Sequence, residues 1–551
     1  MNRDILLSII SAAMLVIAFP PIDLSIFAWI GMVPLFFVLE GKRKGKAFLL
    51  SFFWGFVFFL GTIYWVVNSM VNYGGIPFFT SCLILLLLAI FLSLFHAAFG
   101  FLSATVLSNS SSLLKLLFIP SNWVSLEYIR GNAIEGGFPW VLLGYSQSSS
   151  LSLIQVADIT GVYGISFLAV MFNVFIFISI KGRILKSRNQ KLEVRSNALS
   201  PFFKEGFVIL IVLIIVLGYG LFRINQIDKI SYDWKTLKIG IAQGNIDQGR
   251  KWDASFRKET VDIYRNLSLT LAKNKVDLLV WPETAVPFYL QSDKDLGPQI
   301  FDVPRETNTH LFTGSPAYGL GVGNEVKYYN SAFLITPQNE ITGRYDKVRL
   351  VPFGEYVPFK KYLPFIHKLV VGVGDFTSGN WLKPLEFNGN SFGVLICFES
   401  IFPELSRGFV KEGAGFLINI TNDAWFGRTS APYQHFSQSV FRAVENKVFL
   451  VRAANTGISG VIDPVGRVKL KSGIFTKEAL TADIKIRDAQ SFTPLEGFSG
   501  RKLPGHSKGD NLRKSPLTGF TFYSRYGDIF AIGCLIAVVI FLLIGIRKNV
   551  Y

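Results

Sequence analysis

The first part of the chain consists of long apolar segments separated by short polar loops. Most of these segments have about 17 to 25 residues, the length with which an α-helix crosses a membrane. The first segment is followed at once by another and has no A-x-A cleavage pattern, so we expect an anchor and not a cleaved signal peptide. The pattern predicts eight membrane-spanning helices, at about residues 5–20, 24–40, 47–69, 77–107, 113–131, 161–180, 206–223 and 527–547.

The pattern changes after residue 223. Short apolar and β-branched runs now alternate with polar stretches of helical spacing, as in "TLKIGIAQGNI" (236–246) and "VDLLVWPE" (276–283). Such alternation predicts an α/β domain with a substantial core. The predicted organisation is a membrane bundle (1–223), an α/β domain (236–488), a tether rich in Gly, Ser, Lys and Pro (489–526), and a last membrane helix (527–547).

Composition and charge support a membrane protein. Half of the residues are hydrophobic, and the formal net charge is +17, which by itself is compatible with nucleic-acid binding. Lys and Arg gather, however, in the loops 41–46 and 181–205 and at the end of the chain. With a cytoplasmic N-terminus these regions all fall inside, as the positive-inside rule requires. We therefore expect the charge to set the topology, and we expect no nucleic-acid partner.

This orientation places residues 224–526 outside the cytoplasm, where ATP and nicotinamide cofactors are scarce, so no cofactor is expected. The three cysteines give neither a disulfide framework nor a zinc spacing, and Cys82 and Cys534 lie in apolar segments, where we expect them to be packing residues. The five histidines are scattered and form no HExxH motif, so no metal site is predicted.

Three polar residues follow predicted strands. Glu283 ends "LLVWPE", Lys347 lies in "GRYDK", and Cys397 ends "GVLIC". Each alone has an ordinary explanation, as a turn cap, a solvated lysine or a packed cysteine. Together they supply a thiol nucleophile, a carboxylate that can move its proton, and an ammonium group that stabilises an oxyanion. No histidine lies in these motifs, so a Cys–His pair is not expected.

The order Glu–Lys–Cys in these motifs resembles the nitrilase or carbon–nitrogen hydrolase superfamily. Several longer stretches, some of them in the apolar part, resemble the apolipoprotein N-acyltransferase family within it, and the resemblance covers nearly the whole chain. These stretches are "YDKVRLVPFGEYVP" (345–358), "INITNDAWFG" (418–427), "QHFSQSVFRAVENKVFLVRAANTGISGVIDPVG" (434–466), "GFPWVLLGYSQ" (137–147), "LIQVADITGVYGISFL" (153–168) and "FYSRYGD" (522–528).

The resemblance implies an αββα sandwich on the periplasmic side of the bacterial inner membrane, held by a bundle of about eight helices. Soluble relatives assemble, but we expect a copy held in the membrane to be a monomer. It implies transfer of an acyl chain from a membrane phospholipid, typically phosphatidylethanolamine, to the α-amine of the diacylglyceryl-cysteine of an apolipoprotein, through a cysteine thioester. The residues that it implicates are Cys397 as nucleophile, Glu283 as base, Lys347 at the oxyanion, Glu355 and Glu399 as supporting carboxylates, and Trp252, Phe398 and Trp425 near the substrate.

One position departs from the family pattern, and two alternatives stay open. Phe398 stands where the family commonly has an aromatic hydroxyl, so any orienting role of that hydroxyl is missing. A membrane-tethered amidase would use the same three catalytic residues. A transporter with an outer binding domain would be expected to carry intramembrane charges, but the predicted helices have few beyond Glu127 and Arg130. The apolar stretch 350–359, which contains Gly and Pro, is predicted to be a mobile lid.

Overall fold

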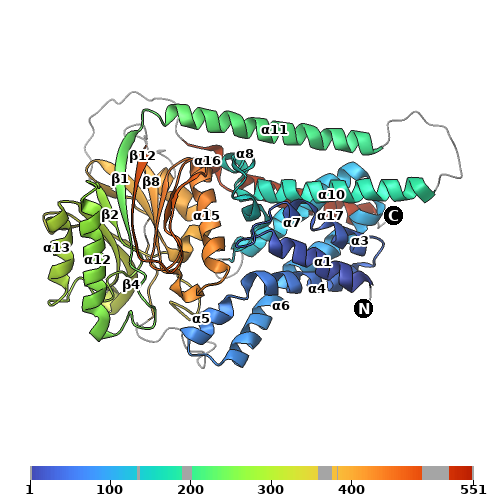
Figure 1. Cartoon of the computed structure of the whole chain (residues 1–551). Helices are drawn as coiled ribbons and strands as arrows, with labels where there is room; N and C mark the ends of the chain where they lie inside the picture. Colours follow the sequence, from blue (N-terminus) through green and yellow to red (C-terminus); the bar gives the residue numbers. More distant parts are fainter. Residues whose placement is uncertain are drawn as a thin grey trace.

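The computed structural model describes residues 3–132, 137–188, 201–357, 375–380, 382–486 and 520–548. A helical bundle and a layered β-sandwich lie beside each other, and both chain ends lie at the bundle (Figure 1). The helices of the bundle and its connections are α1 (Arg3–Ile17), α2 (Phe27–Ile30), α3 (Val33–Leu39), α4 (Lys44–Ile63), α5 (Val66–Asn72), α6 (Phe78–Asn109), α7 (Ser112–Asn132), η1 (Leu143–Gln147), α8 (Leu151–Ile154), α9 (Ala157–Thr160), α10 (Val162–Arg188), α11 (Pro201–Ile230), α16 (Phe522–Tyr526) and α17 (Ile529–Lys548).

All eight predicted segments fall on helices, but not all of them form one long helix. In the described part of the chain, four helices are long and apolar enough to cross a membrane by length and composition, and these are α4, α6, α10 and α11. The predicted span 24–40 is interrupted, because α2 ends at Ile30 and α3 begins at Val33. Pro34 lies in the first turn of α3, where its missing N–H is tolerated but cannot continue an earlier helix.

Helix α11 is the least buried of these four helices. Only 17% of its most apolar window is buried, and it runs along the outside of the bundle as far as the sandwich (Figure 1). It continues past the predicted end at residue 223 to Ile230, and β1 begins at Lys235. The bundle is therefore joined to the first strand of the sandwich by a very short connection.

The sandwich contains two six-stranded sheets. The first has the order β12-β1-β2-β3-β4-β5 and the second the order β11-β10-β9-β8-β7-β6. The strands are β1 (Lys235–Gln243), β2 (Leu278–Val280), β3 (His310–Leu320), β4 (Val326–Ile335), β5 (Ile341–Asp346), β6 (Leu385–Phe387), β7 (Asn390–Ile396), β8 (Phe416–Thr421), β9 (Leu450–Ala454), β10 (Gly460–Ile462), β11 (Val468–Lys471) and β12 (Glu478–Ile486).

The apolar strands explain the layers. β2 and β8 are buried along their whole length, as expected for parallel strands covered on both faces. Between the sheets, the rings of Phe312 and Phe392 lie 5.1 Å apart. Helices cover the outer faces: α12 (Arg257–Ala272) and α13 (Gly297–Thr307) on the first sheet, and α14 (Pro403–Lys411) and α15 (Ala431–Asn446) on the second. The αββα arrangement predicted from the sequence is thus present.

Helix α15 separates the second sheet from the bundle, and nearly all of its residues are buried (Figure 1). Its polar side chains bind the bundle directly. The indole N–H of Trp140 donates to Gln434 over 2.7 Å, and the guanidinium group of Arg442 donates to the hydroxyl oxygen of Tyr145 over 3.2 Å. The sandwich is therefore attached to the bundle through a buried polar interface.

Candidate active site

The candidate nucleophile follows directly after β7. Cys397 is the first residue of the 3₁₀ helix η4 (Cys397–Ile401) and has φ = 54°, in the left-handed region that residues other than glycine rarely adopt. Such backbone strain at a strand end is typical of functional positions, because it aims the side chain out of the sheet. Burial, with a further contribution from Glu283, raises the pKa of the thiol to about 12. Cys397 is therefore a thiol at rest and needs a base.

That base is available at the end of β2. Glu283 is 6% exposed, and its carboxylate accepts a hydrogen bond from the amide of Asn330 over 2.8 Å. Strand β3 approaches this turn closely because it has glycine at position 314. A Cβ atom there would lie 2.8 Å from the Cα atom of Glu283 and 2.5 Å from the backbone nitrogen of Thr284. The glycine thus lets the carboxylate sit against the sheet edge.

The lysine follows β5. Lys347 is 1% exposed, and its ammonium nitrogen lies 3.0 Å from the carboxylate of Glu355 and 3.6 Å from that of Glu283. Burial opposes the charge, but the two carboxylates outweigh it and raise the pKa of Lys347 above its ordinary value. The ammonium group is therefore permanently charged beside the thiol, as an oxyanion stabiliser requires. Glu283, Asn330, Lys347 and Glu355 are called the lysine cluster below.

Glu399 is held mainly by backbone N–H groups, whereas Glu283 and Glu355 lie beside the ammonium group of Lys347. It accepts hydrogen bonds from the backbone N–H groups of Val348 and Arg349 and from the Tyr345 hydroxyl, over 2.7 to 3.0 Å, and its second oxygen accepts from the N–H of Ile396 over 2.7 Å. It therefore connects the residues after Lys347 to the residue before Cys397. Burial raises its pKa to about 7, and these donors partly offset the shift.

The comparisons with known proteins agree with this arrangement. A family model for the apolipoprotein N-acyltransferase N-terminal domain matches residues 11–175, and one for carbon-nitrogen hydrolases matches residues 238–493. An apolipoprotein N-acyltransferase of Geobacter metallireducens is 40% identical over 549 residues, which cover 100% of this chain and 96% of that protein. The chain belongs to the apolipoprotein N-acyltransferase family. Members from Methylococcus capsulatus and Haemophilus influenzae are 30% and 32% identical, cover 98% and 90% of this chain, and are themselves covered over 95% and 92% of their length.

In this member of the apolipoprotein N-acyltransferase family the three predicted substrate residues lie in different places. Trp252 follows the buried Lys251 and lines a pocket together with Pro287 and Phe288. Phe398 directs its ring toward Phe402, with centroids 5.1 Å apart. Trp425 lies at the bundle, where its carbonyl oxygen accepts hydrogen bonds from Asn68 and Ser69 of α5. Trp252 and Phe398 are therefore both next to residues of the site, Trp252 through Lys251 and Phe398 through Cys397 and Glu399, whereas Trp425 contacts the bundle.

Two members of the site were missed by the sequence analysis. Asn330 donates to both Glu283 and Glu355, over 2.8 and 2.7 Å. Lys251 is 1% exposed and donates to the carbonyl oxygen of Glu283 over 3.1 Å. Burial lowers the pKa of Lys251 to about 8, although Glu283 and Cys397 oppose this shift. A polar residue within an apolar strand and a lysine next to a singled-out tryptophan were the available signals.

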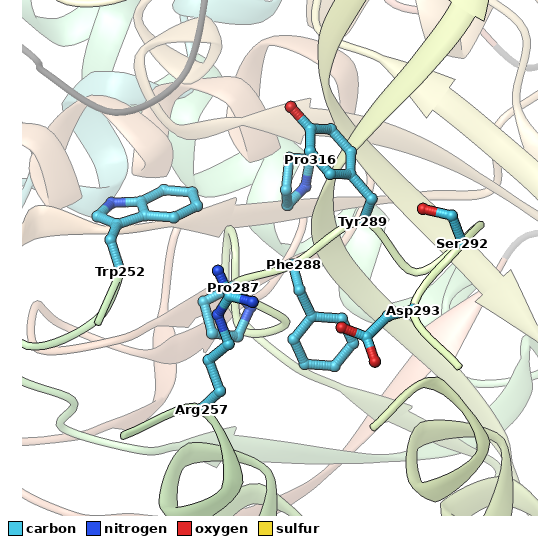
Figure 2. A pocket seen from close by; sticks show the side chains of 8 residues that line it. All are labelled: Trp252, Arg257, Pro287, Phe288, Tyr289, Ser292, Asp293 and Pro316. Carbon is cyan, nitrogen blue, oxygen red and sulfur yellow. The ribbon is translucent and has the colours of Figure 1, made fainter. Parts of the chain in front are cut away.

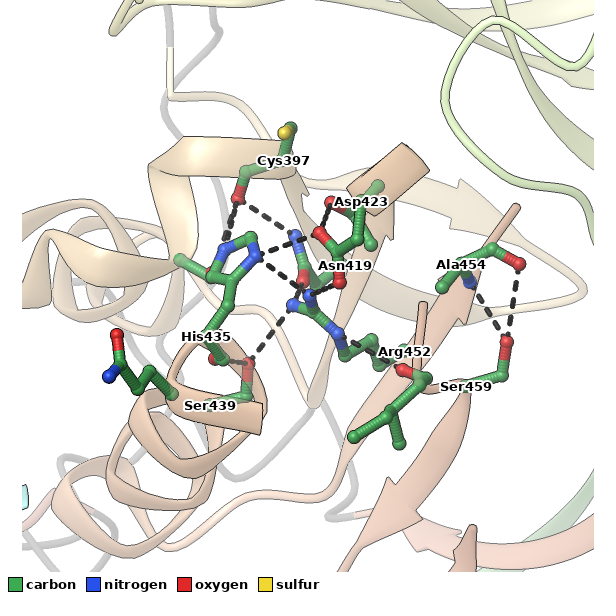
Figure 3. A network of polar contacts seen from close by, with 12 residues as sticks. Cys397, Asn419, Asp423, His435, Ser439, Arg452, Ala454 and Ser459 are labelled. Carbon is green, nitrogen blue, oxygen red and sulfur yellow. Dashed lines mark hydrogen bonds and ion pairs between the residues drawn. The ribbon is translucent and has the colours of Figure 1, made fainter. Parts of the chain in front are cut away.

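A histidine also lies near Cys397, contrary to what its distance in sequence suggested (Figure 3). The Nε2 atom of His435 is 2.8 Å from the Ser400 hydroxyl and 3.2 Å from the carbonyl oxygen of Cys397. Its Nδ1 atom is 3.0 Å from the carboxylate of Asp423, which Arg452 binds over 2.9 Å. Ser400, Asp423, His435 and Arg452 are called the histidine cluster below.

The histidine cluster has the order of a Ser–His–Asp triad, but all its members are 0% exposed. Burial, followed by the charge of Arg452, lowers the pKa of His435 below its ordinary value. Burial favours the acid form of Asp423, but Arg452 and His435 outweigh it and hold its pKa well below the usual range. His435 contacts the carbonyl oxygen of Cys397, and within the described part of the chain it makes no hydrogen bond to the sulfur, so this geometry is compatible with the prediction that no Cys–His catalytic pair operates.

Proposed function

We propose that this protein transfers an acyl chain from a membrane phospholipid to the α-amine of the diacylglyceryl-cysteine of apolipoproteins. The observation that carries the proposal is the position of a strained, buried Cys397 beside Glu283 and Lys347, on a sandwich fixed to an apolar helical bundle. Relatives that align along the whole chain carry the name of this activity.

The first half-reaction loads the enzyme. Glu283 takes the proton of the Cys397 thiol, and the thiolate attacks the ester carbonyl carbon of the phospholipid. Lys347 and the backbone N–H after the nucleophile stabilise the oxyanion. The tetrahedral intermediate collapses, the ester C–O bond breaks, and Glu283 returns the proton to the departing glycerol oxygen. The products are a Cys397 thioester and a lysophospholipid.

The second half-reaction transfers the acyl chain from the Cys397 thioester to the acceptor amine. The α-amine has an ordinary pKa of about 8 and must be neutral to attack, so Glu283 acts as base again. The amine attacks the thioester, its proton passes through Glu283 to the sulfur of Cys397, and an amide forms. Exclusion of water from the thioester distinguishes transfer from hydrolysis. Glu355 and Glu399 hold Lys347 and the backbone around it in place.

We further propose eight membrane helices, a periplasmic sandwich (236–488) and a tether (489–526), because the distribution of Lys and Arg in the loops fits this topology. A location in the inner membrane and a monomeric state complete the proposal. Residues 489–519 of the tether lie outside the described residues. The lid 350–359 is described as far as residue 357, and the N–H of Val351 in it donates to Glu355 over 2.8 Å. We propose that lid movement and the state of Lys347 are linked through Glu355, and that Phe398 and Trp425 contact substrate during the reaction.

The test is intact mass spectrometry of the protein purified from membranes. We expect an adduct of fatty-acyl mass that hydroxylamine removes and that a diacylglyceryl-cysteine peptide discharges with its own N-acylation. Cys397→Ala should carry no adduct, whereas Cys534→Ala, which changes a buried cysteine of α17, should carry as much as the wild type. Absence of the adduct, or its discharge by water as fast as by the peptide, would contradict the transferase and favour a tethered amidase.

A further inference from the structure

A pocket of about 280 Å³ is lined by the segment that follows the candidate base Glu283 and by the start of α12 (Figure 2). Its walls carry aromatic rings and prolines together with one cationic and one anionic side chain. The lining residues are Trp252, Arg257, Pro287, Phe288, Tyr289, Ser292, Asp293 and Pro316. None of the roles given above uses this space as a whole, although Trp252 was singled out in the sequence.

The pocket is joined to the catalytic carboxylate from two sides. Trp252 directly follows Lys251, whose ammonium group donates to the carbonyl oxygen of Glu283 over 3.1 Å. Across the sheet, Pro316 of β3 is paired with Asn330 of β4, which donates to the Glu283 carboxylate. Two residues that line the pocket, Trp252 and Pro316, are therefore each next to a residue that hydrogen-bonds to Glu283. That placement suits a part of the acyl donor which does not itself react.

Two donors of the pocket lack an acceptor. Among the described residues, the indole Nε1 of Trp252 and the Nε of Arg257 are buried atoms without a hydrogen-bond partner. Figure 2 shows the guanidinium group of Arg257 reaching Pro287 between Trp252 and Phe288. Buried N–H groups without acceptors are unfavourable and rare, so this pair indicates a ligand rich in acceptor oxygens.

The charged side chains of the pocket further restrict the chemical class of the ligand. A guanidinium group binds phosphate oxygens through paired N–H donors, whereas a neutral peptide carbonyl offers no charge to match it. The carboxylate of Asp293 is already held by the backbone N–H groups of Asp295 and Leu296, over 3.1 and 2.8 Å. Arg257 is thus the charged side chain of the pocket that has a buried donor to offer.

We propose that this pocket binds the phosphate group of the phospholipid acyl donor, with Arg257 as its main ligand and Trp252 as a second donor. The inference rests on the proposed function, because it assigns part of the donor to a place beside the thioester site. The glycerol backbone then spans the distance between the phosphate in the pocket and the ester carbonyl at Cys397. Arg257 is accordingly a determinant of donor specificity and not of acyl transfer itself.

The experiment compares two acyl donors in single-turnover loading of Cys397, followed by mass spectrometry. One is a diacyl phospholipid, and the other is a diacylglycerol with the same chains and no phosphate. Arg257→Met should lower the ratio of kcat/KM for phospholipid to that for diacylglycerol by about tenfold, since it removes a charge-assisted contact. Lys258→Met is the matched control, because Lys258 is the next residue on α12 and forms an exposed pair with Asp262.

The outcomes distinguish a failure of the phosphate site from a failure of the proposed function. If the wild type forms no thioester with phospholipid, the acyltransferase itself fails. If the wild type loads normally but Arg257→Met keeps the wild-type donor ratio, the phosphate site alone is wrong. It is also wrong if Arg257→Met slows only the discharge by lipopeptide, which would assign the pocket to the acceptor. A wild type that uses diacylglycerol as well as phospholipid would overturn the phosphate site even if the variant did not fold.

Discussion

Two buried polar clusters flank Cys397, and they differ in how completely their hydrogen bonds are satisfied. In the lysine cluster, which extends from the strand ends of the first sheet, the side-chain oxygen of Asn330 is buried without a partner. In the histidine cluster, on the second sheet, every member is 0% exposed and no buried side-chain atom lacks a contact among the described residues. The first is also linked to a pocket, since Asn330 pairs with Pro316, which lines it.

The two clusters match two different requirements of a cysteine nucleophile at position 397. Proton transfer needs a carboxylate that can change its charge and a partner that the substrate can still reach. Holding a residue at φ = 54° needs surroundings that do not rearrange. The lysine cluster is suited to the first task and the histidine cluster to the second. Replacing one carboxylate by an amide in each cluster should therefore reduce activity in the lysine cluster and stability in the histidine cluster.

The largest expected effect comes from the lysine cluster. Glu283→Gln removes the base but preserves the shape and the hydrogen bond to an acceptor oxygen, so thioester formation should slow by about 10³-fold. The variant should unfold at nearly the wild-type temperature, because Lys347 keeps Glu355 as its partner. Single-turnover loading and thermal unfolding in detergent measure the two quantities. A loading rate within tenfold of the wild type would show that another group removes the proton.

The corresponding exchange in the histidine cluster should mainly affect stability. Asp423→Asn leaves the guanidinium charge of Arg452 buried without its carboxylate, which costs about 3–5 kcal/mol of unfolding free energy. Denaturant unfolding in detergent measures this loss. Asp262→Asn, which disrupts an exposed pair with Lys258, is the control and should change stability by less than about 1 kcal/mol. Equal stability of the two variants would contradict the structural role of the histidine cluster.

A smaller effect is expected from Asn330, the uncharged member of the lysine cluster. Asn330→Leu removes the donor to Glu283 and Glu355, and both carboxylates lose the hydrogen bond that orients them. The kcat/KM for loading should fall by about tenfold. Thermal unfolding in detergent, measured beside the loading rate, distinguishes this from a general loss of structure. A loading rate equal to that of the wild type would mean that Asn330 only fills space.

The smallest effect concerns stability and pH at Lys251. Its pKa is about 8 in the folded protein and 10.5 ordinarily, so between these values the unfolded state binds more protons and stability rises with pH. Below pH 8 the buried charge imposes its full cost. The stability of the wild type relative to Lys251→Met should rise by about 1 kcal/mol per pH unit above pH 8. A difference that is constant from pH 7 to pH 10 would contradict the lowered pKa.

The sequence pointed to the candidate catalytic residues more readily than to the polar groups around them. Glu283 and Cys397 could be singled out because each comes shortly after a buried apolar strand, β2 or β7, and Lys347 because it comes directly after β5. Asn330 and His435 were not, because their roles depend on pairing between β3 and β4 and on the packing of α15 against η4. Local periodicity carries no information about either contact.

The same limit applies to the membrane part. The alternation of apolar and polar segments located the long apolar helices, but it located neither the interruption before Pro34 nor the short helices η1, α8, α9 and α16. Polar side chains buried in α7, such as Asn122, Glu127 and Arg130, also lower its mean hydropathy. They contact other parts of the bundle: the amide of Asn122 donates to the carbonyl oxygen of Phe99 in α6, and the carboxylate of Glu127 accepts from the N–H of Leu143 in η1. Hydropathy measures composition and cannot distinguish a side chain that faces lipid from one that faces another helix.

Helix α15 has a consequence for how this enzyme can be divided or recombined. Its ion pair Arg442–Glu445 is 0% exposed, and Thr521, just before α16, donates to the carbonyl oxygen of Glu445 over 2.6 Å. A sandwich released from the bundle would expose this charged pair and the apolar surface around it. The two parts therefore do not behave as exchangeable modules. The catalytic half can be transplanted onto another scaffold only if the face that receives α15 is transplanted with it.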